Sequence, residues 1–584
     1  MKKLLTGNEA FAYGAYLAGV KVAAAYPGTP STEVIQNCAK YDTIYAEWSP
    51  NEKVALDVAI GAAYAGGRAL CAMKHVGLNV AADSLFYSSF TGQKAGLVVV
   101  NADDPGMHSS QNEQDNRNYA KFAKLPMLEP ADSEEAKQFI LLAYEISEMF
   151  DTPVIVRTTT RLSHSRTIVD MDDSQRIVAS TEKVEFERNP GKYHMVPGNA
   201  RRRHTVVEEK IRKLAEYAET FAYNVIETGN YEIGIVTSGV AYQYAREVFP
   251  DATYLKLGMV YPLPKQLILD FAKRVKKVVI IEELDPFFEE YFKTLGIEII
   301  GKDIFPIEGE FSPYLIRELA SKAGLVSAPA TEQPMNLELP IRPPMLCPGC
   351  AHRGIFYALK RLNVVVNGDI GCYALGGSPP LSTMHTSGCM GASIGVVHGV
   401  DKVGVKDRTV AVLGDSTFFH SGIHPLINVL YNKGVSTVII SDNRITAMTG
   451  HQNNPGSGKT LLGEPTEQID LEKLVRGLGA QKVAVVNPYE LDVMIKTLKE
   501  FMEYEEPSVI IARYPCVLHV KEKHPVPEVD LELCTNCGTC LKIGCPPLVK
   551  VENGVVIDAL QCNGCGLCAK ICPFDAIKKP GEQQ

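Results

Sequence analysis

Two apolar segments in the carboxyl-terminal half, residues 409–413 and 435–440, constrain the fold more than any other feature of this chain. Their β-branched residues predict strands, and the helix-like segment between them predicts a crossover that leaves the strands parallel and adjacent. The first strand ends at Gly-Asp-Ser and the second at Asp-Asn-Arg-Ile. Because open α/β sheets bind ligands at the carboxyl ends of their strands, we expect Asp415 and Asn443 to lie side by side, although 28 positions separate them. Their oxygens would suit Mg²⁺ bound to a diphosphate.

The two strand ends resemble the diphosphate-binding motif of thiamine diphosphate enzymes, in which Gly-Asp-Gly is followed further along by Asn-Asn. The resemblance implies that the magnesium ligands are Asp415, Asn443 and the carbonyl oxygen of Ile445. It also implies cofactor contacts from Gly414 and Ser416. The chain departs from the motif at Ser416, where the motif has its last glycine, and at Asp442, where it has its first asparagine. The alternative is an ordinary strand–helix–strand unit with a Gly-Asp turn.

Length and composition predict several globular domains. The 584 residues suggest about four domains, and the apolar share of 46% with a charged share of 22% is typical of globular protein. A net charge of −9 argues against nucleic acid as the main partner. The sequence shows neither a long apolar run nor the apolar stretch of a signal peptide, so we expect a cytoplasmic protein without a membrane partner. In that compartment the fifteen cysteines are better explained as metal ligands than as disulfides.

The first 170 residues alternate short apolar segments with helical patterns, which predicts a parallel α/β domain. The predicted strands are residues 21–26, 69–74, 96–102 and 153–157, and the clearest predicted helices are 51–65 and 133–149. Three loops follow strands, where ligand contacts collect: residues 26–32, 75–79 and 103–108. In the first of them, helix capping by the hydroxyl residues is the simpler interpretation.

The loop Tyr-Pro-Gly-Thr-Pro-Ser-Thr at 26–32 resembles the substrate loop in the pyrimidine domain of 2-oxoacid:ferredoxin oxidoreductases. The resemblance implies that Thr29 lies near the oxoacid carboxylate, and we expect Gly77 of the second loop to contact the cofactor. Residues 47–52 resemble the segment that carries the glutamate facing the aminopyrimidine ring, for which Glu52 is our first choice and Glu47 the second. Such a carboxyl favours the imino tautomer, which then removes the thiazolium proton. Otherwise, Glu52 at a helix start is simply well placed for the helix dipole.

The middle of the chain offers fewer functional features. Residues 171–230 are charged and weakly patterned, and we interpret them as a connecting segment whose basic run, 201–204, is solvated. Residues 231–325 return to an α/β pattern that resembles the carboxyl-terminal domain of transketolase, so we expect no catalytic function there. The proline-rich residues 326–345 read as an extended linker.

Four further cysteines stand at predicted strand and helix ends. They are Cys347, Cys350, Cys372 and Cys516. Four thiolates from such turns suit an iron–sulfur cluster, although a Cys-x-x-Cys pair alone is equally typical of a redox or zinc site. The arrangement resembles the catalytic subunit of 2-oxoacid:ferredoxin oxidoreductases, which implies a [4Fe–4S] cluster next to thiamine diphosphate. We assign residues 346–520 to this diphosphate-binding domain.

Several residues near these cysteines are further candidates. His352 shares a turn with Cys350 and is our first choice among three histidines, with His385 and His420, to orient the substrate carboxylate or move a proton. Residues 388–393 resemble the helix start that approaches the cofactor in this family, which implies a contact from Gly391, and we also expect Asp369 to contact the cofactor. An aryl pocket or core packing would each account for the aromatic residues Trp48, Tyr373, Phe418 and Phe419.

The strongest pattern lies in residues 525–584. Cys562, Cys565, Cys568 and Cys572-Pro fit the bacterial ferredoxin spacing C-x₂-C-x₂-C-x₃-C-P, and a second run departs from it by one extra residue near Gly544. In this fold the fourth cysteine of each run ligates the other cluster. One predicted set is therefore Cys534, Cys537, Cys540 and Cys572. The other is Cys545, Cys562, Cys565 and Cys568. A zinc module is the remaining alternative, and Cys38, Cys71 and Cys389 are left as packed thiols.

Taken together, the chain resembles the family of indolepyruvate:ferredoxin oxidoreductase α subunits over essentially its whole length, with an α/β multidomain fold. The resemblance implies oxidative decarboxylation of an arylpyruvate with coenzyme A, giving an aryl-acetyl-CoA, carbon dioxide and reduced ferredoxin. It also implies a small β subunit in a heteromer of two α and two β chains, in which Glu52 and Asp415 of one chain can serve different sites. The alternatives are the same chemistry on another 2-oxoacid, a non-redox thiamine decarboxylase, and an electron carrier without catalysis.

Overall fold

The computed structural model describes residues 1–174, 176–178, 186–327, 339–340 and 342–580. The chain divides into two compact units, Met1–Leu337 and Glu338–Gln584. Each unit is an α/β structure with its own sheets, which confirms the predicted fold class. Most of the predicted linker, 326–345, lies outside the described residues.

The first unit contains a seven-stranded sheet. Its strands, in spatial order, are β12 (Met259–Tyr261), β6 (Met127–Leu128), β7 (Val154–Thr159), β5 (Leu97–Asp103), β4 (Ala69–Lys74), β2 (Val22–Ala25) and β3 (Tyr45–Trp48). All neighbours are parallel except β12 and β6. The four predicted strands of this region are all confirmed, with ends displaced by at most two residues.

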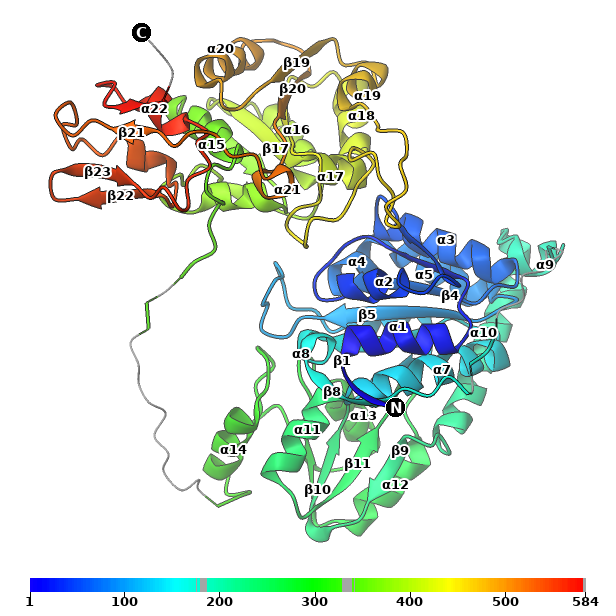
Figure 1. Cartoon of the computed structure of the whole chain (residues 1–584). Coiled ribbons are helices and arrows are strands. Elements are labelled where there is room, and N and C mark those ends of the chain that lie inside the picture. The colour runs from blue at the N-terminus through cyan, green and yellow to red at the C-terminus, as the bar shows by residue number, and fades with distance from the viewer. Residues whose placement is uncertain (175, 179–185, 328–338, 341, 581–584) are drawn as a thin grey trace. The chain divides into compact units, whose positions relative to one another are not determined.

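Helices cover both faces of this sheet (Figure 1). On one face lie α3 (Glu52–Tyr64), α4 (His75–Val80) and α5 (Ala82–Thr91), and on the other α1 (Gly7–Leu17) and α7 (Ser133–Phe150). The predicted helices 51–65 and 133–149 correspond to α3 and α7. Each starts at a side-chain cap: Asn51 accepts a hydrogen bond from the amide of Val54, and Asp132 accepts one from the amide of Glu135.

A second sheet in the same unit has five strands. Its order is β14 (Ile299–Ile300), β13 (Lys277–Ile280), β10 (Asn230–Thr237), β11 (Ala252–Leu257) and β9 (Asn224–Glu227), of which only β9 is antiparallel to its neighbour. The helices α11 (Gly239–Val248), α12 (Lys265–Arg274), α13 (Phe287–Thr294) and α14 (Pro313–Lys322) belong to this part. Strand β12 follows β11 in the chain but joins the first sheet, so the two sheets are tied into one unit.

The expected connecting segment, 171–230, is more regular than its sequence suggested. It contains the short helix α9 (Pro190–Tyr193) and the 22-residue helix α10 (Pro197–Ala218). The basic run is not simply solvated, because Arg203 on α10 donates to the carbonyl of Phe90 at 2.6 Å and pairs with Asp151. Only three residues of α10 are fully buried, Val207, Leu214 and Ala218, and such a narrow apolar stripe explains why the helical pattern was weak in the sequence.

The second unit is built on a six-stranded parallel sheet. Its order is β16 (Thr386–Ser387), β15 (Val365–Gly368), β17 (Thr409–Gly414), β18 (Thr437–Asp442), β20 (Ser508–Arg513) and β19 (Lys482–Val486). The helices α15 (His352–Arg361), α16 (Ala392–Val403), α18 (Ile423–Tyr431), α19 (Leu471–Gly477) and α20 (Leu491–Met502) complete it. The predicted parallel pair of strands, β17 and β18, is confirmed at the centre of this sheet.

The cysteine-rich end of the chain, here called the terminal module, belongs to the same unit. It consists of two small antiparallel pairs, β21 (Glu528–Val529) with β24 (Ile577–Lys578) and β22 (Leu548–Val551) with β23 (Gly554–Ile557). Between them lie the helical turn η3 (Cys540–Ile543) and the helix α22 (Leu567–Ile571). Ile543, Leu567 and Ile571 belong to the same hydrophobic core as the residues of β17 and β18, so this module shares its core with the large sheet. None of the described helices combines the length and apolar character needed to cross a bilayer.

Candidate thiamine and iron–sulfur sites

The carboxyl ends of β17 and β18 bring together the polar residues expected there. Gly414 pairs in register with Ser441, so Asp415 and Asp442 emerge at the same sheet edge. Asp415 is 2% exposed and accepts a hydrogen bond from Asn454 Nδ2 at 3.2 Å. Burial, with the nearby charge of Asp442, raises the pKa of Asp415 to about 7. A carboxylate in this environment would be stabilised by a cation, so the donor set fits Mg²⁺.

The departures from the diphosphate motif are accommodated locally. Ser416 directs its hydroxyl to the hydroxyl of Thr446 at 2.7 Å, so the side chain is absorbed by the loop that follows β18. Asp442 forms ion pairs with Arg513 at 2.6 Å and with Arg444 at 3.4 Å. The amide side chain of Asn443 accepts a hydrogen bond from the backbone of Ile445 at 3.2 Å, which shapes the turn whose carbonyl was predicted as a ligand.

Asp369 organises the start of helix α16 from within the protein. Its carboxylate accepts hydrogen bonds from the amide of Gly391 at 3.0 Å, from the hydroxyl of Ser393 at 2.8 Å and from the hydroxyl of Tyr373. Burial raises its pKa to about 6. Gly391 has φ of +83°, and a Cβ there would lie 2.5 Å from the carbonyl oxygen of Ser421, so only glycine fits. Asp369 thus positions the glycine turn that was predicted to approach the cofactor.

The four cysteines of the large domain line one cavity. It has a volume of about 370 Å³ and is mostly apolar, with Leu346, Leu375, Met448 and Tyr514 in its wall. Cys347, Cys350, Cys372 and Cys516 all contribute to the wall. Burial, reinforced by the other three thiols, raises the pKa of Cys372 to about 12. A mostly apolar cavity with four sulfur donors fits an iron–sulfur cluster.

His352 and Asn443 line the same cavity, so the cysteine cavity adjoins the predicted magnesium site. The Nδ1 atom of His352 lies 3.0 Å from the sulfur of Cys350, and burial lowers the pKa of His352 to about 4. The two other histidines are differently placed: His385 accepts a hydrogen bond from the amide of Val366 at the sheet edge, and His420 contacts the hydroxyl of Ser421.

In the terminal module the cysteines gather in the two predicted sets. One hollow is lined by Cys534, Cys537, Cys540 and Cys572. Burial, reinforced by Cys565, Cys545 and Cys562, raises the pKa of the Cys568 thiol to about 12, and these three cysteines are the remaining members of the other set. The extra residue of the irregular run lies at Gly544, whose φ of +63° lets the chain turn before Cys545. Among the described residues, no group of three or more His, Cys, Asp or Glu side chains is arranged to hold a single metal ion.

In the first unit, Glu52 is the first residue of α3 and is 5% exposed. A Cβ on Gly77 would lie 2.7 Å from its Cγ and 2.8 Å from a carboxylate oxygen, so the glycine is required for the glutamate to occupy this place. The alternative, Glu47, accepts hydrogen bonds from Tyr45 at 2.9 Å and Ser49 at 2.8 Å. The backbone carbonyl of Thr29 accepts a hydrogen bond from Ser109 at 3.4 Å.

Sequence reasoning missed Lys74, the last residue of β4. It is 8% exposed, packs against Gly28 of the predicted substrate loop and donates to the carbonyl of Ser109 at 2.6 Å. Burial lowers its pKa to about 8, although Asp104 acts in the opposite direction. A buried ammonium at a strand end was detectable in principle, because lysine is rare in an otherwise apolar strand.

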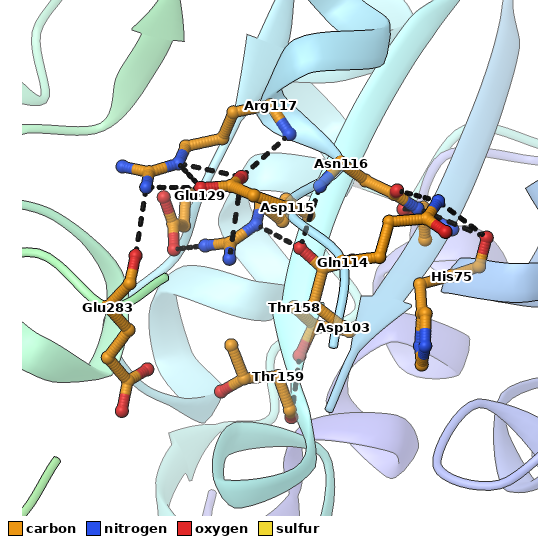
Figure 2. A network of polar contacts seen from close by, with 12 residues as sticks. His75, Asp103, Gln114, Asp115, Asn116, Arg117, Glu129, Thr158, Thr159 and Glu283 are labelled. Atoms are coloured by element: carbon orange, nitrogen blue, oxygen red, sulfur yellow. Dashed lines mark hydrogen bonds and ion pairs between the residues drawn. The ribbon is translucent and has the colours of Figure 1, made fainter. Parts of the chain in front are cut away.

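A buried ionic network also escaped the sequence analysis (Figure 2). Arg117 bonds Asp115 and Glu282, and its guanidinium donates to the backbone carbonyl of Glu283 at 2.9 Å. Arg157 binds Asp103 at 2.7 Å and also pairs with Glu129. The carboxylate of Glu283 points away from Arg117 and accepts from the amide of Phe311. This network joins the first sheet to the region after β13.

One expectation about a side chain needs correction. Cys389 is exposed rather than packed, because it lies in the turn between β16 and α16, whereas Cys38 and Cys71 are buried. Of the two interpretations left open for the aromatic residues, core packing holds for Tyr373, Phe418 and Phe419, which are part of the hydrophobic core and do not line the cysteine cavity. The aromatic residue in that cavity wall is Tyr514, which the sequence analysis did not single out.

Three family models match the chain. Residues 13–232 match "Pyruvate flavodoxin/ferredoxin oxidoreductase, thiamine diP-bdg". Residues 369–512 match "Thiamine pyrophosphate enzyme, C-terminal TPP binding domain". Residues 555–578 match "4Fe-4S binding domain". The chain therefore carries both thiamine diphosphate-binding domains and an iron–sulfur domain.

Relatives of similar length share this organisation. The indolepyruvate oxidoreductase subunit IorA of Archaeoglobus fulgidus is 41% identical, over 99% of this chain and 97% of that protein. The protein of the same name from Methanothermobacter thermautotrophicus is 40% identical, over 100% and 98% respectively. A solved 2-oxoglutarate:ferredoxin oxidoreductase from Magnetococcus marinus is 18% identical, covers 55% of this chain and 65% of its own, and has a TM-score of 0.47. On the full-length identity to the first two proteins, this chain belongs to the family of indolepyruvate oxidoreductase IorA subunits.

Proposed function

We propose that this chain is the catalytic α subunit of an indolepyruvate:ferredoxin oxidoreductase. It oxidatively decarboxylates arylpyruvates with coenzyme A and yields an aryl-acetyl-CoA, carbon dioxide and reduced ferredoxin. The observation that carries the proposal is that one chain combines two thiamine diphosphate-binding domains with twelve cysteines gathered in three sets of four. A decarboxylase without redox chemistry would need no such cysteine sets.

The diphosphate half of the thiamine site is assigned to the second unit. Asp415, Asn443 and the carbonyl of Ile445 would hold Mg²⁺, because hard oxygen ligands are what this ion prefers. Gly414, Ser416 and Gly391 border the same edge, with Asp369 fixing the turn at Gly391. When bound, thiamine diphosphate supplies a carbon nucleophile for the 2-oxo carbon and takes up the electrons freed by decarboxylation.

The pyrimidine half is assigned to the first unit. Glu52 would hold a proton at a pyrimidine ring nitrogen, and Gly77 leaves room for that carboxyl. Thr29 and the nearby ammonium of Lys74 provide a hydroxyl and a positive charge for the carboxylate of the 2-oxoacid. His352, buried beside Cys350, would orient substrate or move a proton in the second unit.

Each set of four cysteines would hold one [4Fe–4S] cluster. The set in the cavity beside Asn443 is closest to the diphosphate half, and the other two sets lie in the terminal module. Bound clusters supply one-electron transfer between the thiamine site and an external ferredoxin. The relatives are named as subunits, and we propose a small β subunit as partner in an assembly of two α and two β chains.

The decisive experiment is anaerobic reduction of a viologen dye by the protein with its β subunit, coenzyme A and a panel of 2-oxoacids. We expect indolepyruvate and phenylpyruvate to give the highest kcat/KM. A preference for pyruvate, 2-oxoglutarate or a branched-chain 2-oxoacid would replace the proposed substrate class, while the chemistry would stand. Decarboxylation without dye reduction would overturn the redox assignment.

A further inference from the structure

Arg353 is a buried guanidinium at the start of α15, three residues after Cys350. It is 2% exposed. A buried cation requires compensation, since burial of an unpaired charge costs several kcal/mol even after the protein relaxes. Arginine keeps its charge in such places because its pKa is very high. The surroundings of Arg353 therefore have to supply the counter-charge.

The guanidinium connects two segments that are far apart in the sequence. On one side it bonds the carbonyl of Leu346 and that of Cys347, the latter at 3.3 Å. On the other side its Nη1 donates to the carbonyl of Ile543 at 2.8 Å and to that of Gly544 at 2.6 Å. These four carbonyls lie at, or within two residues before, Cys347 and Cys545, which belong to two different cysteine sets. Arg353 thus fastens the terminal module to the cavity of the large domain.

The groups that would compensate the positive charge of Arg353 are cysteine sulfur atoms. The groups that favour its positive charge are Cys545, Cys350, Cys347 and Cys565, whereas burial opposes that charge. Within the part of the chain that the structure describes, the hydrogen bonds of the Arg353 guanidinium go to backbone carbonyl oxygens and not to a carboxylate. Neutral thiols would leave this cation uncompensated. Thiolates bound to iron, with the net negative charge of a cluster, would neutralise it.

The third cysteine set offers a contrast. Burial, reinforced by Cys572, Cys534 and Cys537, raises the pKa of the Cys540 thiol, and these three cysteines are the other members of its own set. Arg353 is therefore associated with two of the three sets, the cavity set and the set that contains Cys545. Because the charge of Arg353 is shared by these two sets, its removal should change the properties of both sets together and leave the third set unchanged.

We propose that Arg353 is a positioning residue that serves as the common counter-cation of two iron–sulfur clusters, one held by the cavity set and one by the set of Cys545, Cys562, Cys565 and Cys568. The inference rests on the proposed function, which assigns the clusters to these cysteines. A nearby positive charge favours the reduced, more negative state of a cluster, so Arg353 raises both reduction potentials. It also fixes the two clusters relative to each other through its four carbonyl partners.

The test compares R353Q, which removes the charge, with R353K, which keeps it. The control is R361Q, because Arg361 is exposed at the end of the same helix. Each full-length protein is purified anaerobically with its β subunit, and cluster potentials are measured by redox titration followed by electron paramagnetic resonance. In R353Q we expect two potentials to shift to more negative values while the third stays unchanged. R353K and R361Q should keep all three near the wild-type values.

Unchanged potentials in an R353Q protein with full iron content would overturn the inference, as would an R353K protein whose potentials shift as far as those of R353Q. If R353Q fails to fold, R353K still tests the inference. Its three cluster potentials should stay near the wild-type values, because the charge is kept. Hydrogen exchange around residues 540–545 should become faster, because lysine cannot reach both pairs of carbonyls. Iron content of the wild-type protein is measured first. A wild-type protein with fewer than three clusters would count against the proposed function, whereas three clusters with no effect of R353Q would count against Arg353 alone.

Discussion

Asp415 is a carboxylate that folding places where a negative charge is poorly solvated. It is buried at the end of β17, with Asp442 beside it, and its carboxylate accepts a hydrogen bond from the side-chain amide of Asn454. Such a group is stabilised either by a proton or by a cation. The proposed role follows from this environment, because a bound divalent ion favours the ionised form that neutral pH alone barely reaches.

Replacing Asp415 with alanine should therefore remove the cofactor. We expect D415A to retain thiamine diphosphate at least about tenfold less well than wild type, with the fold intact. Bound thiamine is measured by thiochrome fluorescence after gel filtration. The matched control is D407A, which removes an exposed aspartate before the same strand. Full occupancy in D415A would refute the magnesium assignment.

Glu52 tests the pyrimidine half of the site. E52Q should keep the cofactor but lower turnover by roughly a hundredfold or more, since the amide cannot exchange the proton that activates the thiazolium carbon. Cofactor content and viologen reduction are measured on the same preparation. E47Q is the comparison, because Glu47 is the second choice for this role. Its carboxylate already accepts hydrogen bonds from Tyr45 and Ser49, so we expect E47Q to affect turnover less than E52Q. Normal turnover in E52Q would transfer the role to another carboxyl.

Lys74 predicts the direction in which the KM for 2-oxoacids changes with pH. Burial lowers its pKa to about 8, so the ammonium loses its proton, and its attraction for an oxoacid carboxylate, as the pH rises through that value. We expect the KM for 2-oxoacids to rise above pH 8 in wild type. In K74M the KM should be higher at all pH values and flat across this range. A wild-type KM that stays constant from pH 7 to pH 9.5 would contradict the role.

At the scale of elements, the cavity cysteines come from three separate strand and helix ends. Cys347 and Cys350 precede α15, Cys372 follows β15, and Cys516 follows β20. The parallel order β15-β17-β18-β20 brings these ends to one edge of the sheet. The strand order of the sheet therefore places the proposed cluster ligands together, as it does the proposed magnesium ligands beside them.

Removing one of these ligands should remove one cluster. We expect C516S to contain about eight iron atoms per chain where wild type contains about twelve, because the terminal module keeps its two clusters. Iron is measured by colorimetric assay on anaerobic protein. C389S, which changes the exposed thiol outside the three sets, should keep the wild-type content. Unchanged iron in C516S would eliminate the cavity cluster.

At the scale of the whole molecule, each unit is tied together internally by buried contacts between its parts. In the second unit the terminal module shares its hydrophobic core with the parallel sheet. In the first unit the link is ionic: Arg117 reaches from α6 (Arg117–Ala123) to Glu282 and to the carbonyl of Glu283 (Figure 2). Buried ionic links make stability depend on pH.

Glu283, whose carboxylate lies beside this network and accepts a hydrogen bond from the amide of Phe311, contributes a pH dependence of its own. Burial raises its pKa from 4.5 to about 7, so the folded chain holds a proton that the unfolded chain has lost between these values. Its contribution to stability is present below pH 4.5 and is lost as the pH rises through 7, at a cost of about 3 kcal/mol. E283Q should therefore melt at a higher temperature than wild type at pH 8 and at a similar one at pH 5. Calorimetry of the full chain tests this, with the exposed-site variant E298Q as control; equal curves for E283Q and wild type would contradict it.

The sequence by itself determined the features that are local in the chain. Alternating strands and helices identified the parallel sheets, and the cysteine spacing defined the terminal module. The polar residues after β17 and β18 predicted the sheet edge at which we propose that the diphosphate binds. Each of these signals resides within a few consecutive residues, where periodicity and spacing can be read directly.

Only the tertiary structure decided the burial and the partners of Lys74, Arg353 and Arg117, and the existence of helix α10. Arg353 donates a hydrogen bond to the carbonyl of Gly544, which is 191 positions away in the sequence. Arg117 donates one to the carboxylate of Glu282, which is 165 positions away. Such partners leave no periodic trace in the sequence, and a charged side chain reads as a surface residue until its surroundings are known. The burial of a charge depends on what packs around it in three dimensions, so neither the cost of that burial nor the function it supports can be read along the chain.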